Sequence, residues 1–136
     1  MLITELFDKP VKITDEDYDR ENVLVKFNID GVNYMFYATV AYGDPTCWEV
    51  EFSGKGTTKI TNTGNEIKVF STVVQIMKNM LQLYNIETLY FTADEPSRQK
   101  LYNRMVDKLL PNWHKSFDNE HGIFQVTKPN ADTRTI

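Results

Sequence analysis

Apolar and polar residues alternate along the first half of the chain with a period of two, which is typical of half-buried β-strands. Three such segments follow one another, with core-facing positions Val23, Val25, Phe27 and Ile29, then Val32, Tyr34, Phe36, Ala38 and Val40, then Thr46, Trp48, Val50 and Phe52. Asp30-Gly31 predicts a type I′ hairpin turn, because glycine tolerates positive φ. Gly43-Asp44-Pro45 predicts the next turn. The sequence therefore predicts an antiparallel meander.

Between residues 65 and 110 the pattern changes to helix, strand and helix. The first helix has a broad apolar stripe at helical spacing, made of Ile67, Phe70, Val73, Val74, Ile76, Met77, Met80, Leu81, Leu83 and Tyr84. The nearly continuous apolar run at residues 86–93 is typical of a central strand that is covered on both faces. Asp94 is a suitable N-cap for the second helix, with Pro96 in its first turn, and Pro111 ends it.

The remaining segments complete a single α+β domain over residues 1–136. Residues 1–20 are predicted to be irregular, with a short edge strand at 10–14 followed by an acidic loop. Residues 53–65, rich in Gly, Thr and Asn, are predicted to be mostly loop. Within this loop Lys59-Ile60-Thr61 could form a brief strand. Two further strands are expected at 113–117 and 123–127, and a polar tail at 128–136. The antiparallel meander thus continues into a mixed sheet with the order β-α-β-α-β-β and two main helices.

Composition and charge exclude few functions. The chain has 136 residues, 41% of them apolar and 25% charged, with a net charge of −4. This charge gives no general attraction to nucleic acid or to anionic membranes. We see neither a membrane-spanning run nor a secretory leader. The lone Cys47 excludes an internal disulfide and fits a reducing compartment, so a cytoplasmic protein is expected.

Several polar clusters suggest chemistry, but each has a simpler interpretation. His114, Asp118, Glu120 and His121 surround the C-terminal turn, yet their spacing matches no metal motif, and we predict no metal site. Cys47 lies beside Glu49 and Glu51, which would raise the pKa of its thiol rather than activate it.

Two surfaces are candidates for contact with another protein. Arg98, Lys100, Arg104 and Lys108 form a basic face of the second helix, which by default is a solvated face, although Arg98 and Arg104 could meet phosphate or an acidic partner. Met35 and Tyr37 lie on the strand face opposite Phe36, where they could form an assembly surface.

The second half of the chain resembles the core of the GNAT (Gcn5-related N-acetyltransferase) fold. The segment Ser97-Arg98-Gln99-Lys100-Leu101-Tyr102-Asn103-Arg104 is similar to the late helix of that family, in which a Leu-Tyr pair follows a turn with Asn and Ala. The resemblance implies that Tyr102 protonates the departing coenzyme A thiolate. The chain also resembles small uncharacterised bacteriophage proteins of this general architecture.

The loop before the long helix departs from the family pattern. GNAT enzymes typically bind the coenzyme A pyrophosphate with an Arg/Gln-x-x-Gly-x-Gly/Ala loop, because phosphate must approach bare backbone N–H groups at a helix N-terminus. Here the helix is entered through Asn65, Glu66 and Ile67, with no glycine after Gly64, and Glu66 would repel pyrophosphate. The alternative, Gly54-Lys55-Gly56, precedes the helix body by about a dozen residues, beyond the reach of its dipole.

Two hypotheses follow from the sequence. The first, slightly preferred, is a non-catalytic GNAT-like accessory or virion-associated protein of a bacteriophage, located in the host cytoplasm and binding another protein or a second copy of itself, with no cofactor. The second is an acyl-CoA-dependent N-acyltransferase that uses acetyl-CoA, with Tyr102 as general acid. In that case the acyl-CoA is expected to contact Val69, Phe70, Ser71 and Thr72.

Overall fold

A computed structural model describes residues 11–54, 66–92, 96–118 and 120–129 of the chain. Its strands and helices are, in chain order, β1 (Lys12–Tyr18), β2 (Asn22–Ile29), β3 (Val32–Ala41), β4 (Asp44–Gly54), α1 (Glu66–Leu83), β5 (Thr88–Thr92), α2 (Pro96–Leu109), β6 (His114–Asp118) and β7 (Ile123–Thr127). The strands form one seven-stranded sheet in the order β1-β2-β3-β4-β5-β7-β6. Neighbouring strands are antiparallel except β4 and β5, which are parallel. The predicted α+β class and the element order from β2 onward are confirmed.

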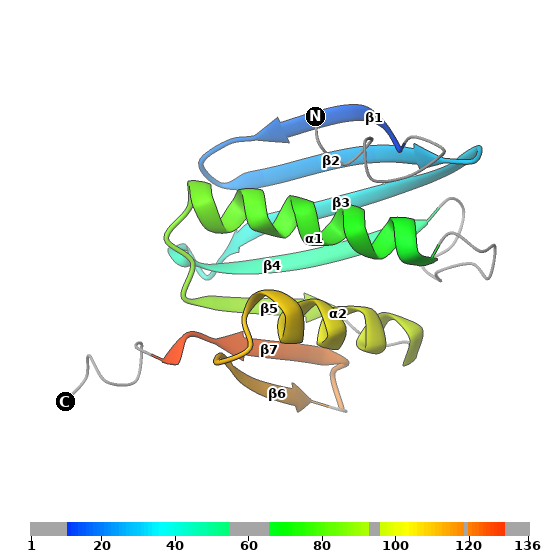
Figure 1. The fold of residues 1–136 in the computed structure, drawn as a ribbon. Coiled ribbons are helices and arrows are strands. Elements are labelled where there is room, and N and C mark those ends of the chain that lie inside the picture. The colour runs from blue at the N-terminus through cyan, green and yellow to red at the C-terminus, as the bar shows by residue number, and fades with distance from the viewer. Residues whose placement is uncertain (1–10, 55–65, 93–95, 119, 130–136) are drawn as a thin grey trace.

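Both helices lie on one face of this sheet (Figure 1). In the figure α1 crosses in front of β2, β3 and β4, while α2 crosses in front of β5 and β7. The opposite face has no helix among the described residues. Figure 1 shows the amino ends of both helices at the edge of the sheet where β4 and β5 end.

The two hairpins of the meander differ in how well the sequence predicted them. At the first, Asp30 and Gly31 have φ values of 51° and 83°, as a type I′ turn requires. At the second, the predicted turn was displaced by one residue, because Tyr42 and Gly43 have φ values of 57° and 66° and β4 already begins at Asp44. A tyrosine in the left-handed region is uncommon, so nothing in the pattern of residues indicated that position.

The acidic segment near the N-terminus was predicted to be a loop within an irregular region, and this is wrong. Residues 12–18 form β1, which pairs antiparallel with β2 at the edge of the sheet. An edge strand exposes one of its sides to water, so charged side chains are tolerated there and also discourage pairing with another chain. The turn comes later, where the Asp19 carboxylate accepts hydrogen bonds from the backbone N–H groups of Glu21 and Asn22 at 2.9 and 2.8 Å.

The core lies between the helices and the sheet. Its largest completely buried side chains are Trp48, Tyr102, Phe27, Phe36, Phe52, Phe91, Ile29, Ile76, Met77, Met80, Leu89 and Met105. Most of the apolar stripe of α1 packs here as predicted, but Ile67 and Leu83, at its two ends, are exposed. Strand β5 is covered on one face only, because Leu89 and Phe91 are buried while Tyr90 is half-buried on the face without helices. No described helix is long and apolar enough to cross a membrane.

Candidate functional site

The parallel pair β4 and β5 separates before β4 ends. Their register runs from Cys47 opposite Thr88 to Val50 opposite Phe91. Beyond Val50, β4 continues to Gly54 and is paired there with β3 alone within the described residues. Backbone N–H and C=O groups on the other edge of this last part of β4 therefore have no strand partner in the described chain. The gap lies at the edge where the amino ends of α1 and α2 also lie.

On the helix-covered face, Tyr102 lies next to the point where the strands separate. Its side chain is completely buried, and the centroid of its ring is 4.5 Å from that of Phe91 with the ring planes inclined by 31°. Phe91 is the β5 residue of the last β4–β5 pair, opposite Val50. Tyr102, the predicted general acid, thus lies adjacent to the gap, with its side chain between α2 and the sheet.

The four predicted cofactor contacts lie in the first two turns of α1. Val69 and Thr72 are buried, and the Thr72 hydroxyl donates a hydrogen bond to the carbonyl oxygen of Lys68 at 2.7 Å. Phe70 and Ser71 are half-buried. Because α1 begins at Glu66, the N–H groups that lack an intrahelical partner belong to earlier residues than these four. The loop before the helix, including Lys55 and Gly56, lies outside the described residues.

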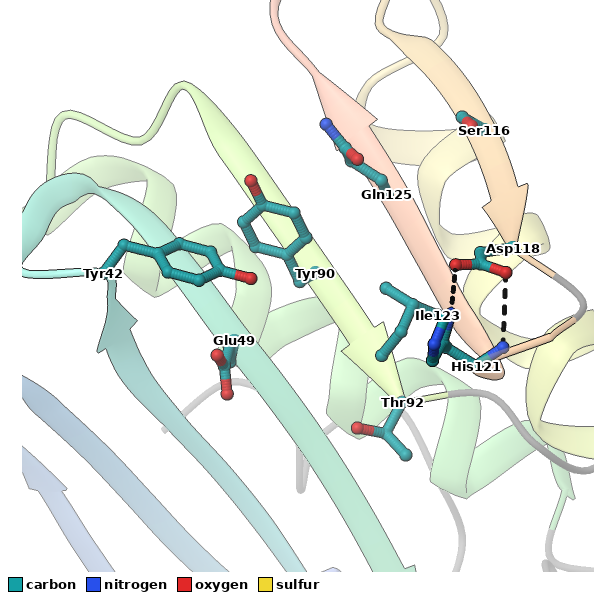
Figure 2. A pocket seen from close by; sticks show the side chains of 9 residues that line it. All are labelled: Tyr42, Glu49, Tyr90, Thr92, Ser116, Asp118, His121, Ile123 and Gln125. Carbon is teal, nitrogen blue, oxygen red and sulfur yellow. Dashed lines mark hydrogen bonds and ion pairs between the residues drawn. The ribbon is translucent and has the colours of Figure 1, made fainter.

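The face without helices has a pocket of about 390 Å³ above β4, β5, β7 and β6 (Figure 2). Strand register builds its floor: Glu49 is opposite Tyr90, Tyr90 is opposite Gln125, and Gln125 is opposite Ser116. A second row follows two residues along, where Ile123 of β7 is paired with both Thr92 and Asp118. Two turns add Tyr42 and His121, which complete the lining.

The pocket is next to the gap between β4 and β5. Glu49 and Tyr90 come one residue before Val50 and Phe91, the last pair of the two strands. Because side chains alternate across a strand, Glu49 and Tyr90 are on the open face while Phe91 and Tyr102 pack together on the helix face. The Glu49 side chain and the Tyr102 ring thus lie on opposite faces of the sheet, next to the last pairs of β4 and β5.

The ionisable side chains of the pocket are two carboxylates, two tyrosines and His121. Glu49 is exposed, and burial raises the pKa of Tyr90, so its hydroxyl group stays neutral at physiological pH. A hydrogen bond from His121, 2.7 Å from the Asp118 carboxylate, lowers the pKa of Asp118. No Lys or Arg lines the pocket. Two carboxylates and two tyrosine rings suit a ligand with a positively charged or neutral amine.

Tyr42 forms one wall of this pocket in an unusual way. Its side chain is 82% exposed, its backbone is in the left-handed region, and its ring meets Tyr90 edge-on with centroids 5.6 Å apart. No sequence pattern indicated this pocket, because its residues come from four strands and two turns that only the strand register brings together.

A second polar cluster overlaps the pocket. One ligand atom each of Asp118, Glu120 and His121 lies within 4.8 Å of the others, and all three side chains are exposed. His114 is at the opposite end of β6 and is not brought to this cluster. The arrangement is that of a polar turn, with the Asp118 carboxylate accepting hydrogen bonds from the N–H groups of Glu120 and His121.

The predicted interaction residues do not form one surface. Met35 is exposed on the open face, and Tyr37 is half-buried there, with its hydroxyl group donating to the Asn22 side chain at 2.9 Å. Arg104 is exposed on α2, with its guanidinium 4.7 Å from the centre of the Phe70 ring. Arg98 was assigned to the solvated basic face, and this is wrong, because it is 4% exposed. It lies one turn before Tyr102 on the inward face of α2.

Comparison with known families assigns the second part of the chain. Residues 51–128 match the model of DUF6934, a family of unknown function. The chain belongs to the DUF6934 family. The matched segment runs from the separated end of β4 to β7, and so includes the gap, both helices and most of the pocket, whereas Tyr42 and Glu49 precede it. Among curated proteins, no sequence matches the chain.

Solved structures with a similar fold are acetyltransferases. A structure of aminoglycoside acetyltransferase AAC(6')-Ib in complex with coenzyme A has a TM-score of 0.52 and 11% identity, covering 85% of this chain and 71% of that one. A structure of the same enzyme with coenzyme A and kanamycin gives 0.50 and 13%, covering 85% and 72%. At such identities the likeness concerns the fold, and it confirms the predicted GNAT-like fold. The predicted likeness to bacteriophage proteins stays a prediction.

Proposed function

We propose that this DUF6934 chain is an N-acyltransferase that moves an acyl group from an acyl-CoA donor to an amine. The observation that supports this most is the separation of β4 and β5 beside a pocket with acidic and tyrosine side chains. The gap offers unpaired backbone groups to a donor on one side, and the pocket offers carboxylates to an amine on the other. The solved acetyltransferases of similar fold contain coenzyme A, which favours the same class of donor.

The residues present suit the two proton transfers that such a reaction needs. An acyl thioester supplies an activated carbonyl carbon, to which the amine nitrogen bonds while the carbon–sulfur bond breaks. Glu49 would accept the proton that the nitrogen loses, and Tyr102 would give a proton to the departing thiolate. Their positions on opposite faces of the sheet, next to the same strand pair, match these two roles.

A pair of glutamates on β4 gives a direct test. Glu49 and Glu51 are both exposed and two residues apart, so they are on the same face of the strand, but only Glu49 lines the pocket. Thiol release from acetyl-CoA should be measured with a panel of primary amines. We expect Glu49→Gln to lower the rate about a hundredfold, since general-base catalysis typically contributes 10²–10⁴-fold. Glu51→Gln should stay within about twofold of the wild type. Equal rates for both variants, or no amine-dependent thiol release by the wild type, would contradict the proposal.

A non-catalytic binding role is the second candidate, favoured by the exposure of Met35 on a sheet face that no described helix covers. Such a protein, whether a phage-type accessory protein or another, would bind a partner or a second copy through this face. Light scattering after size-exclusion chromatography tests self-association. Dimers that become monomers on Met35→Lys, together with no thiol release, would favour this candidate over the acyltransferase.

A further inference from the structure

The buried guanidinium of Arg98 is the least expected feature of the molecule. The residue is 4% exposed, and its Nε and Nη2 atoms are buried with no hydrogen-bond partner in the described part of the chain. Arginine stays protonated in proteins and has five N–H donors, so these donors remain charged when water is excluded. Burying a charge without a partner is strongly unfavourable. An anion bound there would supply the missing hydrogen-bond acceptors.

The position of Arg98 gives that anion a second favourable contact. Arg98 is the third residue of α2, a helix of 14 residues, so it lies in the first turn, where backbone N–H groups have no intrahelical acceptor. The amino end of a helix also has a partial positive charge that stabilises anions. Arg98 and the amino end of α2 therefore belong to the same turn, which follows the end of β5 at the edge where the gap opens.

The same position links the site to the proposed reaction. Arg98 precedes Tyr102 by one helical turn on the inward face of α2, and the Tyr102 ring packs on Phe91 at the last β4–β5 pair. An anionic group held by Arg98 would therefore lie at the mouth of the gap, one turn of helix from the candidate general acid.

We propose that Arg98 and the amino end of α2 bind an anionic oxygen group, a phosphate or a carboxylate of the acyl donor. This deepens the proposed function, because it places donor recognition on α2 instead of on the start of α1. Arginine binds both groups through paired N–H donors, so the two share one recognition chemistry.

Titration calorimetry with pyrophosphate and with succinate, each without any acyl-CoA, tests the proposal. We expect the wild type to bind at least one of them, and Arg98→Met to weaken that binding about tenfold or more, as loss of charge-assisted hydrogen bonds implies. Arg98→Lys keeps the charge but loses the paired donors, so its affinity should be intermediate. Lys108→Met is the control, since Lys108 is an exposed basic residue in the last turn of the same helix, and it should bind like the wild type.

The results separate the two sources of the anion. Binding of pyrophosphate alone indicates a phosphate of the donor, and binding of succinate alone indicates a carboxylate. Binding of both indicates the recognition chemistry that the two groups share. Each of these three results supports the proposal if Arg98→Met weakens the observed binding. Absence of binding, or binding that Arg98→Met leaves unchanged, overturns it. If Arg98→Met does not fold, Arg98→Lys decides: unchanged affinity counts against the proposal and reduced affinity for it. If anion binding depends on Arg98 but the protein releases no thiol from acetyl-CoA, this inference holds and the proposed acyltransferase activity is refuted. If the protein releases thiol but anion binding does not depend on Arg98, the acyltransferase activity holds and this inference is refuted.

Discussion

We predict that Tyr42 makes the protein less stable than an asparagine would at the same position of the turn. It is the first central residue of a type I′ turn, with φ at 57°, whereas Asp30 occupies the equivalent position of the other hairpin. The left-handed conformation costs an ordinary L-residue roughly 1–2 kcal/mol, and Asn tolerates it better because its short side chain bonds locally. Since the Tyr42 side chain is 82% exposed, little apolar burial offsets this cost. Strain retained at an exposed residue that lines a pocket favours a binding role.

The substitution Tyr42→Asn measures this cost. Relief of the backbone should contribute about 1 kcal/mol to stability. Loss of the edge-on contact with Tyr90 should remove about 0.5 kcal/mol, the low end for aromatic pairs, because so much of the ring is in water. The free energy of unfolding should therefore rise by about 0.5 kcal/mol or somewhat more, with Tm higher by about 2 °C.

Urea unfolding followed by fluorescence gives the free energy, with Tyr42→Phe as the matched control. The control retains both the strained backbone and the ring, so its stability should match the wild type within about 0.5 kcal/mol. The affinity of an amine ligand should fall about two- to fivefold in Tyr42→Asn, as loss of an exposed cation–π contact implies. If Tyr42→Asn is destabilised by more than about 0.5 kcal/mol, Tyr42 is a structural residue and the argument from strain fails.

Two further predictions concern single side chains. Tyr34→Phe should stabilise the protein by about 1 kcal/mol, because the buried Tyr34 hydroxyl group has no hydrogen-bond partner among the described residues. Tyr84→Phe should destabilise it by about 1 kcal/mol, because the Tyr84 hydroxyl group donates to the Asp19 carbonyl oxygen at 2.6 Å. Changes of the same sign in the free energy of unfolding, measured in urea, would contradict this prediction. NMR titration of the Asp118 carboxyl should give a pKa below the ordinary value, which His121→Gln returns upward, since the hydrogen bond favours the carboxylate. The stabilisation from this carboxylate should be present above its unfolded-state pKa and lost as pH falls through the lower folded-state pKa; an unchanged pKa in His121→Gln would refute the link.

Local patterns predicted most of the fold because they report directly on one buried face. Alternation at residues 22–52 and the Asp30-Gly31 turn fixed the meander, and helical spacing fixed α1 and α2. The errors occur where tertiary position overrides local chemistry. An acidic segment becomes β1 because the edge of a sheet accepts charge, and β5 keeps an uncovered face because both helices pack on the other side.

The candidate site was much harder to predict. Its floor depends on the parallel register of β4 and β5, which are joined through α1, and sequence spacing does not specify such a register. In the sequence, Glu49 was interpreted only as an outward-facing neighbour of Cys47. Arg98 read as solvated because basic residues surround it in the sequence, although its helical phase, four residues before Tyr102, was a usable signal for burial.

The most direct test of the central claim is a calorimetric titration with acetyl-CoA. We predict saturable one-to-one binding that Phe70→Glu abolishes, because Phe70 is half-buried near the amino end of α1 and its ring contacts Arg104 of α2. Leu83→Glu, at an exposed position at the other end of α1, should bind like the wild type. No heat of binding, or binding that both variants retain in full, would contradict the assignment of an acyl-CoA site between β4 and β5.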